Sequence, residues 1–145
     1  MAVVIIFGPD FVRMQVSDIL QNQINFNKEI KVKIVEKPWG REIWLAQTDQ
    51  YALKIIEFNQ GARSSLQYHI KKHEHIYLDT GLLKIEWEND QGQMEILTLK
   101  AGDLVENKPG RKHRVTAMEN SRIIEVSTPE LDDVVRIEDD YHRNG

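Results

Sequence analysis

A stretch bounded by two glycines, Gly61 and Gly81, constrains this chain more than any other part of its sequence. Gln67 and His69 lie two residues apart within it, so a β-strand would place both side chains on one face. Glu74 follows His69 closely, but leaves room for a turn before the next strand. An amide oxygen, an imidazole and a carboxylate on one face provide most of a divalent-metal site, which one further histidine would complete.

Composition limits the classes of function that this chain can have. Its 145 residues are enough for one domain with a hydrophobic core. The formal net charge is -4, which argues against nucleic acid as a partner. Because the chain contains no cysteine, disulfides are excluded and a metal would need nitrogen and oxygen ligands. We expect a cytoplasmic protein.

The first 30 residues follow a different pattern from the rest. Residues 3–7 are apolar and predict a short buried strand, and Asp10 is a candidate cap for a helix after it. The helix is indicated by apolar residues at helical spacing, which are Val12, Val16, Ile19, Leu20 and Ile24. The first apolar run is too short to cross a membrane and lacks the basic start of a signal peptide. We expect residues 1–30 to be a strand-helix extension that packs on the barrel or on a partner subunit, without membrane contact.

From residue 31 the sequence changes to short strands separated by turns. Residues 83–87 alternate apolar and charged side chains, as a half-buried strand does. Residues 89–92 then predict a polar hairpin turn, and residues 94–99 predict the strand that returns from it. About ten short strands of this kind predict a closed or sandwiched antiparallel barrel.

A second glycine-containing stretch runs from Gly102 to His113 and includes Gly110. Together with the first stretch, it resembles the two sequence motifs of the cupin superfamily, in which each motif supplies metal ligands. The three residues named are in register with the second motif. Lys108 stands where that motif has proline, and Pro109 follows one place late.

Gln67, which stands where most cupins have their first histidine, narrows the resemblance. Ser65-Leu66-Gln67-Tyr68-His69 followed by Glu74-His75 is similar to the phosphomannose isomerase domain of bifunctional mannose-1-phosphate guanylyltransferase/phosphomannose isomerase enzymes. Pro38-Trp39-Gly40 resembles the start of that domain and residues 129–143 resemble its tail. The resemblance therefore covers roughly residues 37–143, without the first 30 residues and without the guanylyltransferase half.

The resemblance implies an all-β cupin jelly roll (a double-stranded β-helix barrel) over residues 31–145, preceded by the strand-helix extension. It also implies one divalent metal ion, held by Gln67, His69, Glu74 and His113. This donor set does not choose between zinc, manganese, iron, cobalt and nickel. His73 and His75 flank Glu74 and would point away from it in an extended strand, so we do not expect them to be ligands.

Basic residues lie close to both motifs in the sequence. Lys72 stands where the family has an arginine tied to isomerase activity, and His113-Arg114 matches a His-Arg pair of the family. The resemblance thus implies catalytic roles for Lys72 and Arg114. Arg111 and Lys112 are candidate substrate-binding residues, because arginine and lysine pair well with phosphate. The alternative is that these basic residues form only a solvated rim.

Three functions agree with these features. The resemblance favours a metal-dependent sugar-phosphate isomerase that interconverts mannose 6-phosphate and fructose 6-phosphate. The second hypothesis is a non-catalytic metal-binding cupin that binds a sugar or small acid. The third is another cupin enzyme, such as an epimerase or a dioxygenase, although Gln67 counts against a typical oxygenase. We expect the chain to act as a homodimer on a small-molecule sugar phosphate.

Overall fold

The computed structural model describes residues 5–7, 10–12 and 32–143 and divides the chain into two compact units, Met1–Lys31 and Val32–Gly145. In the first unit, β1 (Ile5–Phe7) pairs antiparallel with β2 (Asp10–Val12). The predicted strand is therefore present. Asp10, which we expected to cap a helix, and Val12, the first residue of the expected helical pattern, lie in β2 instead; the rest of that helix falls outside the described residues.

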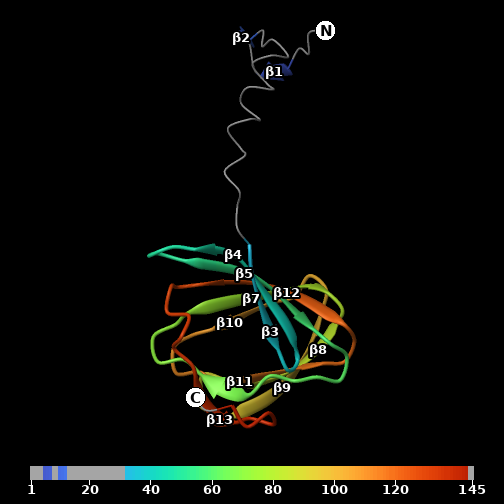
Figure 1. Ribbon diagram of the computed structural model, residues 1–145, viewed down its shortest axis with the longest axis vertical. Helices are drawn as coiled ribbons and strands as arrows, with labels where there is room; N and C mark the ends of the chain where they lie inside the picture. The colour runs from blue at the N-terminus through green and yellow to red at the C-terminus, as the bar shows by residue number, and fades with distance from the viewer. Residues whose placement is uncertain (1–4, 8–9, 13–31, 144–145) are drawn as a thin grey trace. The chain divides into compact units, whose positions relative to one another are not determined.

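The second unit consists of two antiparallel sheets (Figure 1). The six-stranded sheet contains, in spatial order, β10 (Leu104–Asn107), β7 (Glu74–Thr80), β12 (Ser121–Ser127), β5 (Ala52–Phe58), β4 (Gly40–Gln47) and β3 (Lys33–Lys37). The five-stranded sheet contains β13 (Val135–Glu138), β6 (Leu66–Tyr68), β11 (His113–Ala117), β8 (Leu82–Glu88) and β9 (Met94–Lys100). This architecture confirms the predicted all-β cupin jelly roll. In the described part of the chain, no helix is both long and apolar enough to span a membrane.

The interior of the barrel is apolar at one end. Alternate residues of the strands point inward, as the strictly alternating burial along β5 illustrates. Leu78, Leu83, Ile85 and Ile123 are almost completely buried there. Burial of each such side chain stabilises the fold by ~1.5–3 kcal/mol relative to exposure, so this end supplies much of the driving force for folding.

The other end of the interior is polar, although it is formed by the same strands. On β5 the inward positions pass from Phe58 and Ile56 to Lys54, and on β7 from Leu78 and Ile76 to Glu74. β12 changes in the same way from Ile123 to Glu125. Because the strands are paired in register, these charged side chains gather in one half of the barrel.

Gly81, the second glycine of the first motif, has a structural reason to be glycine. It has a positive φ of 95° between β7 and β8, and a Cβ there would lie 2.7 Å from the backbone oxygen of Asn120. Gly102 has a similar φ of 99° but nothing within 4 Å of its missing Cβ. Gly81 therefore allows a turn to pack against the start of β12.

We predict that Gly81→Ala destabilises the protein more than Gly102→Ala does. Both variants carry the cost of a positive φ, ~1–2 kcal/mol. Only Gly81→Ala adds a collision with backbone, which costs a further ~1–3 kcal/mol. Chemical denaturation of both variants measures the difference. Equal losses of unfolding free energy would contradict the close packing of this turn.

Candidate metal centre

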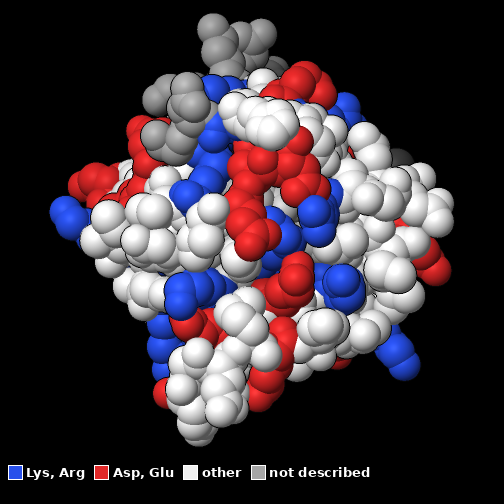
Figure 2. Space-filling model, turned by 90° about the horizontal axis from the view of Figure 1, so that it is seen from below, with Lys and Arg blue, Asp and Glu red and all other residues white. Residues whose placement is uncertain are grey.

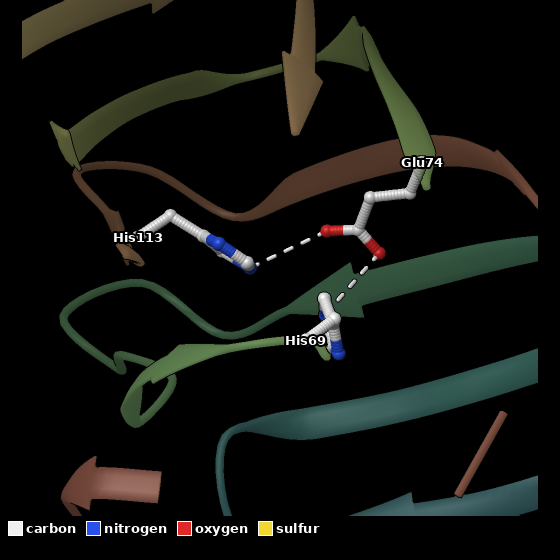
Figure 3. Close-up of side chains that lie close together, drawn as sticks. All are labelled: His69, Glu74 and His113. Carbon is white, nitrogen blue, oxygen red and sulfur yellow. Dashed lines mark ion pairs between the residues drawn. The ribbon is translucent and has the colours of Figure 1, made fainter. Parts of the chain in front are cut away.

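Three side chains from separate segments of the chain meet in the polar half of the barrel (Figure 3). His69 follows β6, Glu74 begins β7 and His113 begins β11. Nε2 of His113 lies 3.3 Å from Oε1 of Glu74, and Nε2 of His69 lies 3.7 Å from Oε2. The two motifs are also joined through the backbone, because the Gly110 N–H donates to the His69 carbonyl at 2.7 Å.

Both imidazole rings are oriented by backbone carbonyls. Nδ1–H of His69 donates to the carbonyl of Asp133, and Nδ1–H of His113 donates to the carbonyl of Arg111 at 3.0 Å. Since a carbonyl only accepts, each neutral ring must carry its proton on Nδ1. This leaves the Nε2 lone pairs directed toward Glu74 as potential metal ligands.

Asp133 fixes the loop that carries His69. Its carboxylate accepts the backbone N–H groups of Ile70, Lys71 and Lys72 at 3.0, 2.5 and 2.9 Å. Burial alone would raise the pKa of Asp133, but these hydrogen bonds outweigh it and lower the pKa. The resemblance of the tail included Asp133 without indicating that it orients a ligand, because this contact crosses between remote segments.

The Glu74 carboxylate is held by partners of several kinds. Asn107, its register neighbour on β10, donates Nδ2–H to Oε1 at 3.0 Å, and the Trp87 indole N–H donates to Asn107 at 3.2 Å. Lys72 Nζ lies 2.5 Å from Oε2. Burial alone would raise the pKa of Glu74, but the Lys72 ammonium outweighs this effect and holds the pKa well below its usual value. Glu74 is therefore a carboxylate at neutral pH.

Lys72 connects the ligand cluster to a row of buried charges. Its ammonium lies 3.0 Å from Glu125 in addition to its contact with Glu74. Burial alone would lower the pKa of Lys72, but these two carboxylates raise it above its usual value, so the side chain remains charged. Lys54 continues the row, 3.6 Å from Glu125 and 3.7 Å from Glu42.

Sequence reasoning did not select Lys54, Glu125 or Glu42 as site residues. A signal was available for Lys54 and Glu125, because each is a charged residue at an inward position of an otherwise apolar strand. Recognising it requires the direction of each strand relative to the core, which the sequence leaves undecided when both faces are partly apolar.

A cavity of about 360 Å³ opens next to the cluster. Gln67, His69, Lys72, Glu74 and His113 all line it, so five of the predicted site residues come together. Oε1 of Gln67 accepts a hydrogen bond from the Ser65 hydroxyl at 2.7 Å. The cationic side chains of the lining are Lys37, Lys54, Lys72, Arg136 and Arg143, and the acidic ones are Glu42, Glu74, Glu125 and Asp132.

The other three predicted site residues, Arg111, Lys112 and Arg114, are not part of this lining. The Arg111 guanidinium stacks over Trp87 and pairs with Asp90. Lys112 pairs with Glu88 at 2.8 Å. Arg114 is buried and pairs with Glu138 at 3.1 Å.

A second group of potential ligands lies on the outside of the barrel. His73 Nε2 is 2.8 Å from Oε1 of Glu106, and His75 lies beside them. His75 is exposed whereas Glu74 is buried, as strand parity predicts. His73 and His75 are therefore separate from the inner cluster.

The inner residues fit a divalent metal ion. Ligand atoms of His69, Glu74 and His113 all lie within 4.8 Å of one another. Nε2 of His69 is buried and has no hydrogen-bond partner among the described residues, an arrangement that metal coordination would satisfy. Two imidazoles and a carboxylate, with the Gln67 amide on the same cavity, suit a borderline transition metal.

We predict that the purified protein binds one divalent ion at this cluster. His69→Ala and His113→Ala should each lose the ion and its stabilising effect on the melting temperature, because a metal stabilises only the state that binds it. His142→Ala, at an exposed residue of the tail, is the matched control. Metal analysis and thermal melts test this, and unchanged metal content in both cluster variants would contradict the assignment.

We also predict a pH dependence for the metal-free protein. The pKa of Glu74 is lowered in the folded state, so its contribution to stability is present above the ordinary value of 4.5 and is lost as the pH falls below it. Denaturation in EDTA over this pH range should show that the unfolding free energy of Glu74→Gln falls less steeply toward acid pH than that of the parent. Glu119→Gln, at an exposed glutamate, should retain the parent slope. Identical slopes for all three proteins would refute the lowered pKa.

Comparisons with known structures identify the same fold. KdgF from Halomonas sp. matches with 23% identity and a TM-score of 0.61, over 73% of this chain and 94% of that chain. A variant of oxalate decarboxylase from B. subtilis matches with 16% identity and a TM-score of 0.67, over 91% of this chain and 42% of that chain. An RmlC-like cupin from Shewanella frigidimarina matches with 18% identity and a TM-score of 0.58, over 74% and 90%. At these identities, the likeness shows the fold alone.

The comparison with protein families is more specific. No curated protein matches the chain. Residues 24–139, however, match the family described as mannose-6-phosphate isomerase C-terminal. This match spans both motifs, all the strands from β3 to β13 and the residues of the metal centre. The chain therefore belongs to the cupin-type mannose-6-phosphate isomerase C-terminal family.

Proposed function

We propose that this chain is a metal-dependent aldose–ketose isomerase that interconverts mannose 6-phosphate and fructose 6-phosphate. The observation that carries the proposal is the buried His69–Glu74–His113 cluster, which opens on a cavity lined by charges of both signs with a small excess of cations. The membership of the family supports the same reaction.

The charge of the cavity favours an anionic sugar. Five cationic and four acidic side chains line it, and a divalent ion at the cluster would increase the positive excess. Its volume of about 360 Å³ lies at the lower end of the range for small-molecule sites, ~300–1,000 Å³. A compact, phosphorylated monosaccharide suits both properties.

The side chains around the cluster can divide the work of an isomerisation. A divalent ion bound there would supply Lewis-acid polarisation of the carbonyl and hydroxyl oxygens. The Lys72 ammonium lies beside that position and stabilises negative charge that develops on the sugar oxygens. Glu125, which lines the cavity 3.0 Å from Lys72, carries the proton between C1 and C2.

The phosphate requires a cation away from the reacting carbons. Lys37 on β3 and Arg136 on β13 both line the cavity, and Arg136 is the register neighbour of Gln67 on β6. Phosphate held there would orient the sugar with its carbonyl end toward Glu74. The proposal assigns the phosphate to this pair because Arg111 and Lys112 do not line the cavity.

A non-catalytic binding protein is the second candidate. Lys72 and Lys54 already pair with Glu125, and pairing with two cations weakens a carboxylate as a base. A chain that binds an anionic sugar without turnover would need the same cavity and no proton carrier. Affinity alone therefore does not separate the two functions.

We predict that the purified chain forms fructose 6-phosphate from mannose 6-phosphate in a coupled assay with added divalent metals. EDTA should abolish turnover. Glu125→Gln should retain bound metal and lose at least ~100-fold in kcat, the usual effect of removing a general acid or base. Glu119→Gln, at an exposed glutamate that is not part of the cavity lining, should retain parent activity.

The outcomes separate the two candidates. Turnover that requires both metal and Glu125 supports the isomerase. Sugar-phosphate binding without turnover under any metal would reject it in favour of the binding protein. Full activity of Glu125→Gln would agree with the isomerase function but would reject Glu125 as the proton carrier.

A further inference from the structure

The outer face of the six-stranded sheet carries apolar side chains on every strand. Cross-strand register joins them into one continuous row, which we call the outer ladder: Leu104, Tyr77, Ile124, Ile55, Ile43 and Ile34. Each is the direct register partner of the next. The ladder therefore crosses the whole sheet from edge to edge, on the side opposite the metal centre.

Several members of this face are well exposed. Leu104 is 59% exposed, Ile34 55% and Tyr77 39%, and Val126 beside the ladder is 48% exposed. Figure 2 shows the face seen from below in Figure 1, where acidic and basic side chains are interspersed with the other residues. Removing apolar surface from water lowers the free energy. A continuous apolar row across one sheet therefore marks a surface at which contact with a partner is favourable.

A charged row runs beside the outer ladder and alternates in sign. From β7 to β3 it consists of Asp79, Arg122, Glu57, Arg41 and Glu36. Arg122 opposes Glu57, Glu57 opposes Arg41, and Arg41 opposes Glu36 in the register. Neighbouring strands thus present opposite charges along one edge of the ladder.

We propose that the outer ladder is the interface of a homodimer, in which the six-stranded sheets of two copies pack face to face around a two-fold axis. The axis runs parallel to the strands and passes between β12 and β5, which are the third and fourth of the six strands. Such an interface uses the same surface of both copies.

Four of the five charges in the row meet an opposite charge under this axis. Rotation about the centre of the sheet places Arg122 over Glu57 of the second copy, and Asp79 over Arg41 of the second copy. Opposite signs meet because the charges alternate and the number of strands, six, is even. An axis through the middle of any single strand would instead bring like charges together. This match of the row with itself selects a second copy of this chain as the occupant.

The apolar residues match under the same axis. Ile124 of one copy faces Ile55 of the other, and Val126 faces Leu53 of the other. Two sheets packed in this way lie ~10 Å apart, the distance at which such side chains interdigitate.

Substitution on the two sheets tests the proposal. Analytical ultracentrifugation of the full chain should give the dimer mass for the parent. Val126→Asp and Ile34→Asp should each give the monomer mass. Ile96→Asp is the matched control, because Ile96 is 68% exposed but belongs to β9 of the other sheet, and it should remain dimeric. A monomeric parent would overturn the proposal, and so would a dimer that only Ile96→Asp disrupts.

Cross-linking tests the position of the axis without weakening the face. The chain contains no cysteine, so a single introduced thiol is unambiguous. Under the proposed axis, position 126 of one copy lies one strand away from position 126 of the other copy. A short bismaleimide should therefore join two Val126→Cys chains covalently. Ile96→Cys should give no covalent dimer. Cross-linking of Ile96→Cys alone, or of neither variant in a dimeric protein, would place the interface elsewhere and reject the outer ladder.

Discussion

The buried carboxylate of Glu74 is the interaction on which the polar half of the barrel depends. Isolating such a charge from water costs several kcal/mol, so the fold must surround it with compensating groups. Lys72 provides the charge, Asn107 the neutral hydrogen bond, and two histidines face its oxygens. Removal of any one leaves the others with an incompletely paired ion.

The charges that compensate Glu74 are the start of a row of paired charges that continues outward along the cavity. A metal bound to Glu74 would weaken the pairing of that carboxylate with Lys72. Glu125, which lies 3.0 Å from Lys72, would then remain the partner of the ammonium. Lys54 and Glu42 continue the same alternation toward Lys37, where the row reaches partly exposed side chains. The alternating row therefore permits several charges to lie within a barrel whose other end is apolar.

The two faces of the six-stranded sheet serve different purposes. The inward residues of β12 and β5 supply both core packing and the charges of the cavity, while the outward residues of the same strands form the outer ladder. Strand parity makes this separation possible, since neighbouring residues point to opposite faces. The proposed dimer and the proposed reaction thus depend on the same strands but on no common side chain.

The sequence by itself determined the all-β jelly roll and predicted the residues that meet in the candidate metal centre. Glycine and histidine spacing, strand alternation and the resemblance to a family all act over short stretches of chain, where local geometry is nearly fixed. His69 and Glu74 are close in sequence, and one turn brings them together.

Only the tertiary structure decided which basic residues share the cavity with that centre. Arg111 and Lys112 are near His113 in sequence but pair with Asp90 and Glu88 outside the cavity. Lys54 and Glu125 are remote in sequence yet lie next to Lys72, because the register of β5 with β12 turns them inward at the same level. Direction and register are set by the packing of whole sheets, and sequence proximity carries no information about either.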